Sequence, residues 1–68
     1  MKISLEEAIE LMSTGRICKS VDAAGNVRRF RINNDIMYYS FQNGWNTYHF
    51  NAKDFIKTKW YLSEDNDV

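Results

Sequence analysis

The chain has 68 residues, of which 44% are hydrophobic and 15% aromatic, and its nine basic side chains balance nine acidic ones. A chain of this length forms one domain with a small core, which its many aromatic rings can fill. Zero net charge excludes the strong overall field by which many proteins attract nucleic acid or membranes. We expect a cytoplasmic protein, because the single cysteine, Cys18, forms no disulfide within the chain and neither a signal peptide nor a membrane-spanning run is evident.

The first predicted element is a helix that begins after Ser4. Ser4 is a good N-cap, and Glu7 follows three residues later, which completes the capping-box pattern. Gly15 predicts the end of the helix, because a glycine there adopts positive φ without strain. The apolar stripe of this helix recurs at helical spacing and consists of Leu5, Ala8, Ile9 and Met12.

Strands are expected at residues 16–21, 27–32, 36–41 and 45–50, because β-forming residues there are separated by turn residues. Within residues 27–32, Phe30 and Ile32 share a face with Arg28, whereas Arg29 and Arg31 point the other way. Turns are predicted at residues 22–26 and 33–35 and at Asn43-Gly44, where the two residues favour a type I′ hairpin.

A short helix over residues 52–57 is expected next, with Asn51 as its cap and with Phe55 and Ile56 facing inward. A final strand at residues 60–62 follows. The predicted fold class is α+β: an N-terminal helix packed on a small antiparallel sheet of four to five strands, with a short helix before the last strand. Residues 1–63 form the single domain, and residues 64–68 form an acidic flexible tail.

Catalysis and metal binding are not expected. Cys18 and His49 are the only thiol and imidazole and lie on separate segments, so they make neither a nucleophile–base pair nor a four-ligand metal site. The carboxylates lie on the polar face of the first helix or at turns and caps, and the isolated glycines form no phosphate loop. We therefore predict a protein that is not an enzyme and needs no cofactor.

The candidate for chemistry is a group of arginines and aromatic residues in the middle of the chain. Residues 16–31 carry a net charge of +4, from five basic residues against Asp22. Guanidinium groups pair with phosphate and exposed rings stack on bases, so such a sheet binds a nucleotide or a single strand. The alternative is that about half of the rings are core and the arginines are solvated. The candidate ligand-binding residues are Arg28, Arg29, Arg31, Tyr38, Tyr39, Trp45 and Tyr48.

Both ends of the chain resemble a family of small phage and prophage domains. Residues 5–12 (Leu-Glu-Glu-Ala-Ile-Glu-Leu-Met), Gly15-Arg16-Ile17, residues 51–56 and Trp60-Tyr61-Leu62 are similar to its opening helix and closing helix–Trp strand. The family includes Thoeris anti-defence proteins, which sequester cyclic ADP-ribose-type immune signals in pockets between protomers. The resemblance implies a phage protein, acting in the host cytoplasm, with this fold and a nucleotide ligand.

Three functions follow from the sequence. The first is a nucleotide-signal sponge that counters host defence without turnover. The alternative is an inhibitor that acts by direct protein–protein contact with a host enzyme, since Tyr, Trp and Arg commonly anchor interfaces. The third is a single-strand nucleic-acid binder, which the neutral overall charge disfavours. A homo-oligomer is also expected, because the core is small and aromatic residues are in excess.

Overall fold

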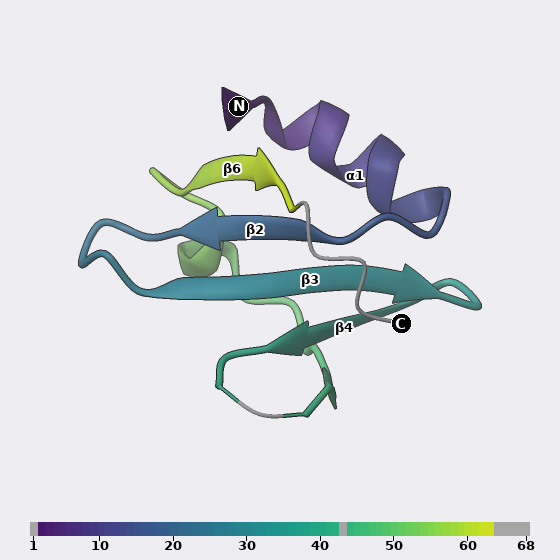
Figure 1. Cartoon of the computed structure of the whole chain (residues 1–68). Coiled ribbons are helices and arrows are strands. Elements are labelled where there is room, and N and C mark those ends of the chain that lie inside the picture. The colour runs from purple at the N-terminus through teal and green to yellow at the C-terminus, as the bar shows by residue number, and fades with distance from the viewer. Residues whose placement is uncertain (1, 43, 64–68) are drawn as a thin grey trace.

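A computed structural model describes residues 2–42 and 44–63, which form one antiparallel sheet with an α-helix on one of its faces (Figure 1). The strand order is β1-β6-β2-β3-β4-β5. The predicted α+β class is confirmed, with six strands rather than four or five. No helix in the described part of the chain is long and apolar enough to cross a membrane. The elements are β1 (Lys2–Ile3), α1 (Leu5–Ser13), β2 (Cys18–Val21), β3 (Val27–Asn33), β4 (Ile36–Ser40), β5 (Asn46–Thr47), the 3₁₀ turn η1 (Ala52–Asp54) and β6 (Lys59–Leu62).

Helix α1 has the caps that the sequence predicts at both ends. The Ser4 hydroxyl accepts a hydrogen bond from the Glu7 backbone N–H at 3.1 Å, and the Ser4 N–H donates to the Glu7 carboxylate at 3.1 Å. Gly15 has φ of 96°, and the Arg16 N–H donates to the Leu11 carbonyl at 3.1 Å, as in a Schellman motif. The motif turns the chain back toward the sheet.

The core lies between α1 and the sheet, and Phe30 of β3 is at its centre. Ala8 and Met12 of α1 are fully buried against it, together with Cys18 and Trp60. The Phe30 side chain is 1% exposed. Four other rings surround it at centroid distances of 5.2–6.3 Å: Tyr39, Tyr48, Phe55 and Trp60.

The extra strand comes from the N-terminus. Lys2 pairs with Tyr61 and Ile3 with Trp60, which makes β1 the edge strand beside β6. Two residues are too few to show the alternation from which a strand is predicted. The first predicted strand is also shorter than expected, because β2 begins at Cys18 and not at residue 16.

The tightest hairpin joins β3 and β4. Asn33 pairs with Ile36, and the two residues between them, Asn34 and Asp35, have φ of 54° and 65°. Positive φ at both central residues defines a type I′ turn, which Asn and Asp tolerate better than other non-glycine residues. The type I′ turn is thus at Asn34-Asp35, whereas the sequence predicted that turn type at Asn43-Gly44.

The segment after β4 differs from the prediction of a hairpin at Asn43-Gly44 and a strand at residues 45–50. Tyr39 pairs with Asn46 and β4 extends to Ser40, so five residues separate β4 from β5, and the returning strand is limited to Asn46–Thr47. A two-residue turn at Asn43-Gly44 would have required a register shifted by two residues. Trp45 therefore lies in the connection, and Asn43 is outside the described residues, as are residues 64–68 of the predicted tail.

The short helix predicted for residues 52–57 is limited to η1. Its cap is confirmed, because the Asn51 side chain accepts a hydrogen bond from the Lys53 N–H at 3.1 Å. Lys57 has φ of 59°, which ends any helical path. Phe55 packs inward as expected, but Ile56 is 62% exposed, so the inward orientation predicted for Ile56 was wrong.

Substituting Phe30 tests the position of the core. Phe30→Ala should cost about 3–5 kcal/mol, because it removes the ring that four others contact. That is comparable with the whole stability of a domain of this size, so the variant should be largely unfolded at 25 °C. Phe50→Ala is the matched control: Phe50 is 74% exposed and contacts the ring of Phe55, so its loss should change the unfolding free energy by at most about 1 kcal/mol. Thermal and urea unfolding followed by circular dichroism measure both, and equal effects would contradict the assignment.

Candidate functional site

The alternation of side chains along β3 divides the predicted binding residues into two groups on opposite faces of the sheet. Arg28 and Phe30 point toward α1, whereas Arg29 and Arg31 point to the opposite face. The predicted set is therefore two sites and not one. Arg28, Tyr39 and Tyr48 lie on the helix side, and Arg29, Arg31, Tyr38 and Trp45 lie on the other.

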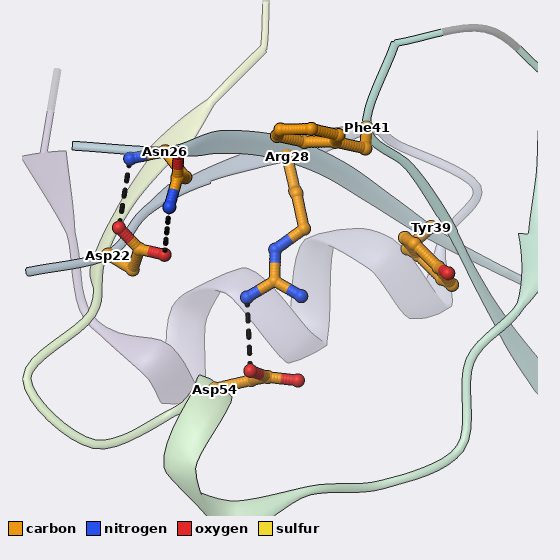
Figure 2. Close-up of a pocket in the computed structure, with 6 residues that line it drawn as sticks. All are labelled: Asp22, Asn26, Arg28, Tyr39, Phe41 and Asp54. Atoms are coloured by element: carbon orange, nitrogen blue, oxygen red, sulfur yellow. Dashed lines mark hydrogen bonds and ion pairs between the residues drawn. The ribbon is translucent and has the colours of Figure 1, made fainter. Parts of the chain in front are cut away.

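On the helix side, Arg28 is held by Asp54 of η1 (Figure 2). One guanidinium nitrogen lies 3.2 Å from the Asp54 carboxylate, and the two side chains are 17% and 26% exposed. The Tyr48 hydroxyl donates to the other Asp54 oxygen at 2.8 Å. Arg28 also lies 5.7 Å from the Phe30 ring centroid. These contacts tie η1 to the central strand, so the charge of Arg28 is already paired.

Titration of this cluster follows from its contacts. Hydrogen bonds from Arg28 and Tyr48 lower the pKa of Asp54. Burial and the hydrogen bond to Asp54 raise the pKa of Tyr48. At neutral pH the pair is therefore a carboxylate and a neutral phenol, and neither group is prepared to exchange a proton.

A shallow depression of about 430 Å³ surrounds Arg28 and opens widely to solvent. Asp22 forms one side of it, but its carboxylate accepts the backbone N–H groups of Ala24 and Asn26, each at 2.9 Å. The hydrogen bonds from Asn26 lower the pKa of Asp22. The polar groups of this depression therefore serve the turn and the η1 link. Its lining residues are Asp22, Asn26, Arg28, Tyr39, Phe41 and Asp54 (Figure 2).

On the opposite face, two arginines converge on Trp45. The Trp45 ring centroid lies 4.6 Å from the Arg31 guanidinium carbon and 5.5 Å from that of Arg29. Both distances are within the range of cation–π attraction. Tyr38 is directly opposite Arg31 in the β3–β4 pairing. The sequence predicted these residues as binding groups, and the long connection after β4 brings Trp45 over β3.

The same face continues across the rest of the sheet with residues that the sequence analysis did not select. Lys19 is paired with Arg29 on one side and with Tyr61 on the other, and Tyr61 is paired with Lys2. Lys59 shares this face because it is two residues from Tyr61. We call this surface the basic face, formed by Lys2, Lys19, Arg29, Arg31, Tyr38, Trp45, Lys59 and Tyr61.

Alternation within single strands was the signal that could have found these residues. Lys19 stands between the buried Cys18 and Ser20, so it must point away from the core. Tyr61 likewise follows the buried Trp60. Their adjacency, however, depends on β6 pairing with both β1 and β2, which no local pattern in the sequence encodes.

Other reactive groups in the described residues form no site. Cys18 is fully buried, and burial raises the pKa of its thiol, which disfavours the reactive thiolate. His49 is exposed and lines a smaller depression of about 230 Å³ beside Asn51 and Asp54. No group of three or more His, Cys, Asp or Glu side chains within residues 2–42 and 44–63 is arranged to hold a metal ion.

Comparison with known proteins gives no relative: no protein-family model, no curated protein and no solved structure matches this chain.

Acid unfolding tests the Asp54 link. Because its pKa is lowered in the folded protein, ionised Asp54 stabilises the fold above the unfolded carboxyl pKa of about 3.9, and this contribution is lost as the pH falls through the lowered value. Asp54→Asn should reduce the unfolding free energy at pH 7 by about 1 kcal/mol and flatten its decline below about pH 4. Urea unfolding at several pH values measures both.

Asp22→Asn provides a comparison, because the pKa of Asp22 is also lowered but by hydrogen bonds within its own turn. The stability losses should be close to additive in the double variant, since the two substitutions remove separate hydrogen bonds, apart from a small electrostatic coupling through Arg28. An Asp54→Asn protein with the wild-type acid dependence would contradict the role assigned to Asp54.

Proposed function

We propose that the protein is a non-enzymatic binding protein that sequesters a nucleotide-type ligand on the basic face. The observation that carries the proposal is the pair of arginines on Trp45, with Tyr38 opposite Arg31. A nucleotide combines a phosphate with an aromatic base, and this cluster offers partners for both. Guanidinium groups bind phosphate with two parallel hydrogen bonds, and Trp and Tyr rings stack on bases.

The charge arrangement supports an anionic ligand. Arg29 and Arg31 project from the same face of β3, and both guanidinium groups lie on Trp45. A phosphate bound at this cluster would contact both guanidinium groups.

The chemistry of the basic face favours holding a ligand over transforming it. Its described side chains are lysines, arginines and aromatic residues, together with the polar Asn33, Ser40 and Thr47 and the apolar Val21, Val27 and Ile36. It contains no carboxylate, imidazole or thiol in this part of the chain that could act as base or nucleophile near neutral pH. This agrees with the sponge function implied by the resemblance to Thoeris anti-defence proteins. The phage origin and the anti-defence role remain predictions.

Titration with ADP and with cyclic ADP-ribose tests this proposal. Isothermal calorimetry should show binding to at least one of them. Arg31→Gln and Trp45→Ala should each weaken it about tenfold or more, because a charge-assisted hydrogen bond or a base stack contributes about 1–3 kcal/mol. Mass spectrometry of the released ligand should find it unaltered.

Arg16→Gln is the matched control for this titration, because Arg16 is an exposed arginine that lies outside the sheet. It should leave the affinity unchanged. Absence of binding to both nucleotides, an equal loss in the Arg16 variant, or a chemically changed ligand would each contradict the proposal. Melting temperatures of all variants verify that they are folded.

An inhibitor that acts by protein contact is the second candidate. The observation that favours it is a set of exposed apolar side chains near η1: Phe50 is 74% exposed and Ile56 62% exposed. The centroid of the Phe50 ring lies 5.3 Å from that of Phe55, and Phe55 packs against the core. Binding of a host enzyme that is lost in a Phe50→Ser, Ile56→Ser variant but kept in Arg31→Gln would support this function over the first.

A further inference from the structure

We infer that the ligand of the basic face is single-stranded nucleic acid, bound across the strands from β4 to β1. This inference rests on the proposed function, because it assigns the ligand class of the same face. It requires, in addition, that the part of the face away from Trp45 takes part in binding.

The basic face is longer than a single nucleotide can cover. Arg29, Lys19, Tyr61 and Lys2 are consecutive partners across β3, β2, β6 and β1. Neighbouring strands are about 4.8 Å apart, so this row spans about 14 Å. A mononucleotide that stacks at Trp45 lies over β3 and β4 and leaves the far part of the row, which consists of Lys19, Tyr61 and Lys2, without a partner. A strand of several nucleotides covers the whole row.

Aromatic rings and cations alternate along the basic face. Tyr61 lies between Lys2 and Lys19 in the row, and Tyr38 lies beside Arg31. A single strand presents phosphates and unstacked bases in turn, and proteins bind it with cations and stacking rings on a sheet surface. A duplex hides the faces of its bases, so the rings would have no role in binding it.

Charge is segregated among the described residues, which weakens the objection from zero net charge. No strand in the described chain carries a carboxylate. The described acidic residues are confined to α1, to turns and to η1. The strands, in contrast, carry six basic residues, of which Arg28 lies on the helix side and pairs with Asp54. The five on the basic face are Lys2, Lys19, Arg29, Arg31 and Lys59.

A length series of oligothymidylates, from the mononucleotide to the octanucleotide, tests the inference on the full chain. The affinity should rise with length up to about four nucleotides and then level off. At the plateau, log K should fall with log salt with a slope of about −0.7 for each phosphate neutralised, or about −3 for four. Fluorescence anisotropy of labelled oligomers at several salt concentrations gives both quantities.

Variants of Lys19 and Tyr61, in the far part of the row, separate this inference from the proposed function. Lys19→Gln and Tyr61→Leu should each weaken the hexanucleotide about fivefold or more and change the mononucleotide less than twofold. Tyr61→Phe, which keeps the ring, should restore the affinity for the hexanucleotide. Lys19→Gln should also reduce the salt slope by about 0.7, a change that a merely unfolded or loosened protein would not produce.

The outcomes are distinct. Binding of the mononucleotide without any gain from length would overturn this inference and leave the proposed function standing. Equal affinity for a duplex of the same length would also overturn it. Failure of every oligomer and nucleotide to bind would remove both. A length-dependent affinity that requires Lys19 and Tyr61 would establish a single-strand site.

Discussion

The two-residue alternation of β3 is the constraint on which the rest of this structure depends. Phe30 occupies the centre of the aromatic core, so its neighbours in the strand must point to the other face. A slip of one residue would expose Phe30 and bury Arg29 and Arg31, at a cost no small domain can sustain. Packing therefore determines where the arginines lie. The core and the basic face are two consequences of the same strand register.

The three arginines of β3 show how position determines the role of a residue type. Arg28 lies on the helix side, where its guanidinium group pairs with Asp54, which also accepts a hydrogen bond from Tyr48. This ion pair connects η1 to the sheet. Arg31 lies on Trp45 with no carboxylate in contact among the described residues. Arginines of one strand thus differ in role: Arg28 joins η1 to the sheet, whereas Arg31 lies on the face for which we propose ligand binding.

Local features of this fold were predictable from the sequence, and contacts between distant segments were not. The capping box at Ser4, the Gly15 stop and the opposite orientation of Phe30 and Arg31 each depend on residues close in sequence. The pairing of β1 with β6 and the restriction of β5 to two residues depend on contacts between distant segments, so no local sequence pattern predicts them. The same distinction holds for the site. Arg29, Arg31, Tyr38 and Trp45 were predicted and are brought together, whereas Lys2, Lys19, Lys59 and Tyr61 join the site only through the β6 pairings.

The place of β6 in the sheet has a consequence for when the basic face is complete. β6 is the last strand in the chain, yet it lies between β1 and β2, which are among the first elements (Figure 1). Contacts between such distant segments form late, because the intervening chain must be ordered before they are made. During synthesis, β2, β3 and β4 can pair while the edge of β2 is still open. The continuous basic face is complete only when β6 fills that edge, because β6, which carries Tyr61 and Lys59, lies between Lys19 of β2 and Lys2 of β1.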